Sequence, residues 1–335
     1  DFVEMNHYIA QLRAEAFPDL DRLKEALLET DPRKRLTQLV EYLDQLKSLI
    51  LSEKTYAVRE DIYKKRHVAA DIPSMYGSYH ELKFDAMGLT FRIESLVNVL
   101  FEELVDQIDL SLITKATFFQ IYDLLQLFNS ALKLDGTPSV EFDGQMELLA
   151  HALQVRGFSL TQYLDIFKGI TRAVKNIIND YFNNIHGRNL NRILSIMPPE
   201  QILPKYLPQN DTMDSERLQH RVSEIFFRDR ISLSLGLPQL DLFLSRILST
   251  LFRQADKLPR AKLHLLLNYD PKHAMTCIGN VDKKINGVIY LGNKGYNLTK
   301  LHGFGLSIPP GFIITTEVFR CREIIASYPP AEQNF

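Results

Sequence analysis

Long rows of apolar side chains, spaced alternately three and four residues apart, constrain the fold of this chain more than any other feature of its sequence. Four such rows occur, and each marks one face of an α-helix. The longest row comprises Leu160, Tyr163, Phe167, Ile170, Val174, Ile177 and Tyr181. A face of this width must be buried, and packing against other helices is the natural way to bury it. The sequence therefore predicts a mainly α fold that begins with a multi-helix N-terminal array.

The other three rows are shorter and lie within residues 36–50, 93–108 and 118–132. Weaker helical patterns predict two further helices, at 215–230 and 239–254. None of these segments alternates in twos, as a half-buried strand would. We therefore expect β structure only after about residue 285.

Helix-breaking residues and a change in texture divide the chain. A turn is expected at 135–138, and Ser159 is expected to cap the helix that follows it. Prolines 198, 199, 204 and 208 mark a candidate linker. We predict a helical domain at 1–197, a Pro-rich linker with further helices at 198–270, and a small β-α-β piece at 271–335.

The charge balance argues against several classes of partner. The 335 residues carry a formal charge of −2, so nothing attracts the chain generally to nucleic acid or to acidic membranes. No apolar stretch approaches the length that spans a bilayer, about 18 residues. The two cysteines have no CxxC spacing, which fits a reducing compartment. We expect a cytoplasmic protein without nucleic-acid or membrane partners, and the chain is expected to be part of a longer one.

The densest polar and aromatic stretch of the helical region runs from Arg66 to Glu94. Two interpretations are open: an irregular binding or docking loop, and a helix–turn–helix junction whose charges pair with one another. The junction is the favoured interpretation. His67 and His80 lack the spacing of a zinc motif, and no metal site is predicted.

The region after residue 285 has a different pattern. It predicts a strand at 288–291, a tight loop at 292–295, a helix at 296–302, a strand at 312–315 and a final helix at 317–327. A Gly-Asn-Lys-Gly loop between a strand and a helix can bring backbone N–H groups to a phosphate, and Lys294 adds a positive charge there. From the spacing alone, a phosphate loop and a purely structural turn both remain open.

The whole stretch "LGNKGYNLTKLHGFGLSIPPGFIITTEVF" is more specific than its parts. It resembles the opening of the nucleotide-binding domain of pyruvate phosphate dikinases and phosphoenolpyruvate synthases. The resemblance covers residues 288–320 alone. The positions that agree are Gly292, Lys294, Gly295, Asn297, Leu298, Gly305, Pro309, Gly311, Phe312, Thr315, Thr316 and Glu317. Asn293 departs from the family, which has glycine there, although Asn tolerates left-handed backbone.

The resemblance implies that residues 271–335 open an ATP-grasp-like α/β domain, with ATP and Mg²⁺ as cofactors. It implies that Lys294 contacts the ATP phosphates and that Gly292, Gly295, Thr315 and Thr316 belong to the same site. The family transfers phosphate by way of a histidine on a swivelling domain to a pyruvate-like acceptor. The segment is expected to hold no catalytic residue of its own. We expect the helical region to be regulatory or scaffolding, with a regulatory partner.

Two alternatives stand beside this interpretation. In the first alternative, the chain is a helical protein-interaction or regulatory module whose tail binds no nucleotide. Another nucleotide-binding protein with the same opening motif, such as an antibiotic phosphotransferase, is the second alternative.

Overall fold

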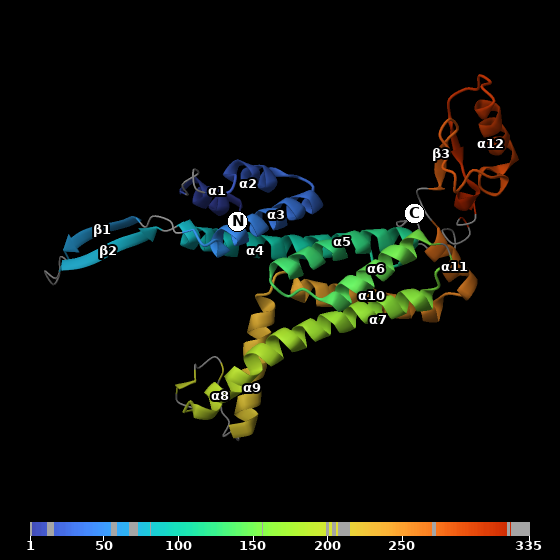
Figure 1. The fold of residues 1–335 in the computed structure, drawn as a ribbon. Coiled ribbons are helices and arrows are strands. Elements are labelled where there is room, and N and C mark those ends of the chain that lie inside the picture. The colour runs from blue at the N-terminus through green and yellow to red at the C-terminus, as the bar shows by residue number, and fades with distance from the viewer. Residues whose placement is uncertain are drawn as a thin grey trace. The chain divides into compact units, whose positions relative to one another are not determined.

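The fold is mainly helical, as the apolar rows predict (Figure 1). The computed structural model describes residues 2–11, 17–54, 59–66, 73–80, 82–155, 157–198, 201–202, 206, 215–269, 273–319 and 322. The elements in chain order are α1 Phe2–Gln11, α2 Leu20–Leu28, α3 Pro32–Leu51, β1 Arg59–Arg66, β2 Pro73–His80, α4 Leu82–Gln107, α5 Lys115–Leu134, α6 Val140–Gln154, α7 Leu160–Ile177, the π-helix η2 Ile178–Gly187, α8 Arg188–Ile196, α9 Ser215–Ser232, α10 Leu237–Lys257, α11 Arg260–Asn268, β3 Met275–Cys277, α12 Val288–Gly303 and β4 Phe312–Ile314.

Each predicted apolar row lies on a helix of the structure. The rows at 36–50 and 118–132 fall inside α3 and α5. The row at 93–108 lies on α4 except for Ile108, which follows its last residue. The row at 160–181 runs through α7 and continues into η2. Ser159 caps α7 as predicted: its hydroxyl accepts the Gln162 N–H while the Gln162 side chain accepts the Ser159 N–H.

The described residues pack into two compact units, each assembled from separate chain segments. The first unit comprises 1–105, 127–138 and 232–239. The second unit comprises 106–126, 139–231 and 240–335. Helix α5 therefore contributes its first half to the second unit and its second half to the first.

Stacked aromatic rings lie at the centre of the first unit. Phe101 of α4 and Phe128 of α5 stack with their ring centroids 4.2 Å apart. Gly236 closes over them with φ +71°, and a side chain there would meet the Phe101 ring at 3.0 Å. The Asn98 side-chain oxygen accepts the Gly236 N–H at 2.7 Å, so the loop between α9 and α10 is fixed against α4.

A second aromatic stack lies in the second unit, where α5 meets α7. The Phe118 ring lies 4.1 Å from that of Tyr163 and 5.6 Å from that of Phe167. Gln254 of α10 reaches the turn before α5, where its side chain accepts the Ile113 N–H at 2.9 Å and donates to the Ile113 carbonyl at 3.0 Å. The start of α5 is thereby held by a buried side chain from another helix.

The prediction that β structure is confined to the region after residue 285 is wrong. Strands β1 and β2 pair antiparallel from Arg59 opposite His80 to Arg66 opposite Pro73, and β3 also precedes residue 285. The favoured helix–turn–helix junction at 66–94 is therefore wrong as well, and residues 67–72, with His67, lie outside the described part. The reason is that β1, with the sequence REDIYKKR, has no alternation of apolar and polar residues from which a strand is recognised.

Candidate functional site

The second unit ends in a tail, described over residues 273–319, which is a two-stranded sheet covered on one face by α12. Strands β3 and β4 pair antiparallel, with Met275 opposite Ile314 and Cys277 opposite Phe312. Ile313 is the middle residue of β4 and is buried against Gly295 of α12. A side chain at Gly295 would approach the Ile313 methyl group to 3.0 Å, so this close packing of helix on strand requires glycine.

The strand predicted at Val288–Leu291 is wrong, because these residues form the first turn of α12. The N–H groups of Tyr290 and Leu291 both donate to the Gly287 carbonyl, at 3.1 and 2.9 Å. The β-branched Val288 and Ile289 favour extended backbone. However, only four residues lie between Gly287 and Gly292, and the β-propensity of so short a segment does not determine its secondary structure. The helical turn also buries the Leu291 side chain.

Gly292 interrupts α12 and directs the chain into the helix that carries Lys294. Its φ of +66° and ψ of 169° leave the helical region, and helical backbone resumes with the next residue. The tight loop predicted at 292–295 is therefore reduced to this single residue. Nothing lies within 4 Å of a side chain built there, so the positive φ alone favours glycine.

Lys294 lies in the first helical turn after this kink, and its side chain is exposed. Among the described residues no ion pair or hydrogen bond engages its ammonium group. The first N–H groups of a helical segment lack partners within the helix, and a lysine beside them adds positive charge. This arrangement suits an anion better than a neutral ligand.

The two predicted threonines use their hydroxyl groups inside the tail. Thr315 is fully buried, and its hydroxyl donates to the His273 carbonyl at 2.6 Å. The Thr316 hydroxyl donates to the Ile289 carbonyl, which ties the end of β4 to the first turn of α12. The structure therefore uses both donors to fix the frame around Lys294.

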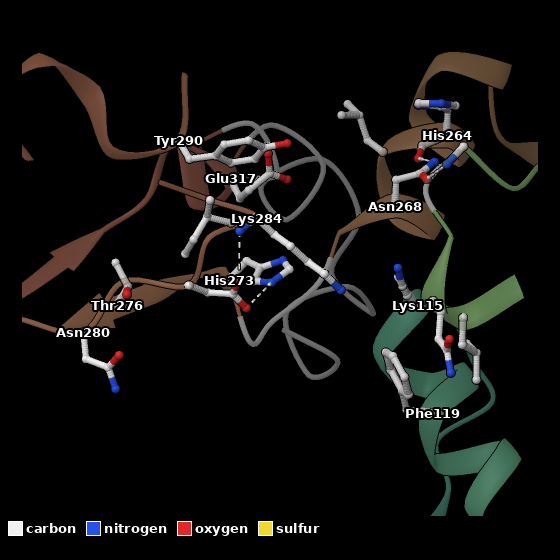
Figure 2. Close-up of a pocket in the computed structure, with 16 residues that line it drawn as sticks. Lys115, Phe119, His264, Asn268, His273, Thr276, Asn280, Lys284, Tyr290 and Glu317 are labelled. Atoms are coloured by element: carbon white, nitrogen blue, oxygen red, sulfur yellow. Dashed lines mark hydrogen bonds and ion pairs between the residues drawn. The ribbon is translucent and has the colours of Figure 1, made fainter. Parts of the chain in front are cut away.

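A cavity of about 650 Å³ lies in the second unit (Figure 2). Its helical wall is formed at the ends of α5, α6 and α11, and it includes Lys115, Phe119, Gln154, Gly157, His264 and Asn268. Asn268 fixes this wall by accepting the Gly157 N–H at 2.7 Å and donating to the His264 carbonyl at 2.7 Å.

The other wall of the cavity comes from the tail. It includes His273, Thr276, Asp282, Lys284, Tyr290 and Glu317. Asp282 organises this wall, because one of its oxygens accepts the Lys284 N–H at 2.8 Å and the other lies 3.8 Å from the His273 ring nitrogen.

None of the five predicted site residues is among the residues that line this cavity. The structure places Gly292, Lys294 and Gly295 together on α12, and Thr315 and Thr316 behind them at the end of β4. The cavity residues were missed because they form no motif: Lys115, His264 and Lys284 lie far apart in sequence. The Asp282-Lys283-Lys284 stretch indicates at most a turn.

The described residues bring together no group of three or more His, Cys, Asp or Glu side chains that could hold a metal ion. No residue in the described part of the chain is therefore assigned to Mg²⁺.

No single helix in the described part of the chain is both long enough and apolar enough to cross a membrane. The helices Glu216–Ser232 and Leu237–Lys257 are bent by 91° at the break between them. Only when the two are taken together do they have the length and the apolar composition of a membrane span.

Comparison of the chain with protein-family models, with curated proteins and with solved structures gives no match.

Proposed function

We propose that the chain is the N-terminal part of an ATP-dependent phosphotransferase of the phosphoenolpyruvate synthase and pyruvate phosphate dikinase type. Residues 271–335 would open its ATP-grasp-like domain, and Lys294 would contact the ATP phosphates. The helical part is then regulatory or scaffolding. On this proposal the full-length protein uses ATP and Mg²⁺ and passes phosphate to a pyruvate-like acceptor, and this chain alone does not transfer phosphate.

One observation carries the proposal: an exposed lysine lies between two glycines that the structure requires for different reasons. Gly292 supplies a positive φ, and Gly295 supplies the close contact with Ile313. A structural turn alone needs the first glycine and has no use for a lysine without a partner among the described residues. The pair of glycines instead holds Lys294 at a helix start, where an anion is stabilised.

The ATP phosphates suit this place because they are anions. Bound ATP would supply the transferable phosphoryl group. Lys294 would neutralise part of the phosphate charge, and backbone N–H groups of the same turn would orient it. Thr315 and Thr316 would hold the frame through their bonds to the His273 and Ile289 carbonyls.

The test uses the full-length protein with Lys294→Ala. We expect the catalytic efficiency with ATP to fall about ten- to a hundredfold, because a charge-assisted contact is worth about 1.5–3 kcal/mol. The melting temperature should not change, since the side chain is exposed. Lys294→Arg should restore activity only in part, because a planar guanidinium replaces a compact ammonium.

Lys300→Ala is the matched control, because Lys300 is an exposed lysine on the same helix. It should leave kinetics with ATP unchanged. Unchanged kinetics for Lys294→Ala would return the loop to a structural role and contradict the proposal.

A second candidate function is a helical protein-interaction module that binds no nucleotide. The observation that favours it is a row of exposed apolar side chains on α4, formed by Phe84, Met87 and Phe91. Three such residues on one helix face are unusual for a surface that contacts only water. Full-length protein that binds no ATP would favour this candidate.

A further inference from the structure

We propose that the loop at 232–239 is a pH-dependent latch: the first unit holds it while Glu94 carries its proton and releases it more readily once Glu94 is ionised. The loop belongs to the first unit, whereas the residues on either side of it, 139–231 and 240–335, belong to the second. The state of Glu94 therefore acts on the connection between α9 and α10. This inference does not depend on the proposed function.

Two side chains of the first unit hold neighbouring N–H groups of the latch. The Asn98 side chain accepts the Gly236 N–H at 2.7 Å, and the Asp135 carboxylate accepts the Leu235 N–H at 3.3 Å. The bond to Asp135 is the longer and hence the weaker of the two. Leu235 and Leu237 are almost completely buried. Opening the latch therefore breaks both bonds and exposes both leucines.

Glu94 lies where these bonds are made. It precedes Asn98 by one helical turn, so the two residues share a face of α4. Its negative charge and that of Asp135 repel each other. Lys47 of α3 supplies a positive charge beside Asp135, and its ammonium group donates to the Leu134 carbonyl at 2.6 Å. The latch itself contains no charged residue, so two ionised carboxylates exceed the charge of this one lysine.

Ionisation of Glu94 favours the open latch. Glu94 is half-buried, and burial followed by the charge of Asp135 raises its pKa from 4.5 to about 7. An open latch lets water reach both carboxyl groups, which returns the Glu94 pKa toward its ordinary value. The closed form holds the proton more tightly, so its advantage over the open form falls as the pH rises from about 4.5 to about 7.

The experiment measures hydrogen–deuterium exchange of the whole chain at pH 5 and pH 8, by mass spectrometry of a peptide that covers 232–239. Each exchange time is divided by that of an unstructured chain at the same pH, which gives the protection of the peptide. We expect the protection of the latch to fall about tenfold from pH 5 to pH 8, because water partly screens a half-buried charge. At both pH values it should be lower than that of a peptide covering 93–104 of α4, since the latch opens while the rest of the unit stays folded.

Glu94→Gln keeps the shape of the side chain and cannot ionise, so the protection of the latch should be nearly the same at both pH values. Glu102→Gln is the matched control, because Glu102 is an exposed carboxyl group on the same helix. It should keep the tenfold fall.

Three results overturn the proposal. The first is a protection of the latch that does not change with pH in the unaltered chain. The second is a tenfold fall that persists in Glu94→Gln. The third is equal protection of the latch and of 93–104 at both pH values, since the loop would then open only when the whole first unit unfolds.

Discussion

Glu94 of α4 shares a half-buried place in the first unit with Asp135, close to the loop at 232–239. Burial, and then the negative charge of Asp135, raises the pKa of Glu94 to about 7 from an ordinary value of 4.5. Burial also raises the pKa of Asp135, while the Leu235 N–H and the charge of Lys47 act to lower it. Two carboxyl groups therefore meet where the loop is anchored, and one of them titrates near neutral pH.

The sign of the pH dependence follows from where the proton is held more tightly. The folded chain keeps the Glu94 proton to higher pH than the unfolded chain does. The free energy of unfolding therefore falls as the pH rises from about 4.5 to about 7, and the full penalty is present above pH 7.

Glu94→Gln removes this titration while keeping the shape of the side chain. We expect the substitution to stabilise the protein at pH 8 by about 1–2 kcal/mol, a value reduced because water partly screens a half-buried charge. The advantage should shrink toward pH 5. Thermal melts at both pH values measure it.

Glu102→Gln is the control for this substitution, since Glu102 lies on the same helix and is exposed. It should change the melting temperature little at either pH. A Glu94→Gln advantage of the same size at pH 5 and pH 8 would show that its carboxyl group is not perturbed.

At the scale of elements, the buried link between α10 and α5 makes the clearest prediction. Gln254→Leu would leave both the N–H and the carbonyl of Ile113 buried without their partner. We expect the free energy of unfolding to fall by about 2–4 kcal/mol, since each unsatisfied buried group costs about 1–3 kcal/mol. Denaturant unfolding of the variant measures the loss.

Gln126→Leu is the comparison at this scale. The Gln126 side chain donates to the Tyr122 hydroxyl at the surface of α5, where water replaces the bond. Its loss should cost less than about 0.5 kcal/mol. Equal losses in the two variants would mean that Gln254 does not hold the turn.

The sequence predicted those elements whose apolar rows have a clear period. Helices α3, α5 and α7 follow from such rows, and the Ser159 cap from its position before one of them. The hairpin of β1 and β2 could not be predicted this way, because β1 is a run of charged residues without alternation. The turn at Val288–Leu291 was misassigned because local β-propensity opposes what burial of Leu291 and the kink at Gly292 impose.

The two candidate sites also differ in how far the sequence predicts them. Lys294 and its two glycines lie within four residues, so a local motif could reveal them. Lys115, His264 and Lys284 meet only through the fold of the second unit. No spacing in the sequence marks them, since their proximity depends on where α5, α11 and the tail come together.

At the scale of the whole molecule, the first unit depends on two segments that lie after residue 105 in the sequence. Its core includes Phe128 and Leu132 from 127–138, and Leu235 and Leu237 from 232–239. All four side chains are almost completely buried. The Phe101 ring in particular stacks on Phe128, so residues 1–105 alone expose one face of their own core.

We therefore expect a fragment of residues 1–105 to lack a cooperative thermal transition that the whole chain shows. Loss of a buried Phe and a buried Leu costs about 5 kcal/mol or more, which matches the entire stability of a weakly stable domain. A fragment of residues 1–138 regains Phe128 and Leu132 but not the loop that Asn98 and Asp135 hold, and it should recover the transition at a lower temperature than the whole chain. Circular dichroism at 222 nm during heating distinguishes the three proteins, because helix content reports the core on which these helices depend. A sharp transition in the shortest fragment, equal to that of the whole chain, would contradict this dependence, since a core that lacks the Phe128 ring on which Phe101 stacks would then be complete without it.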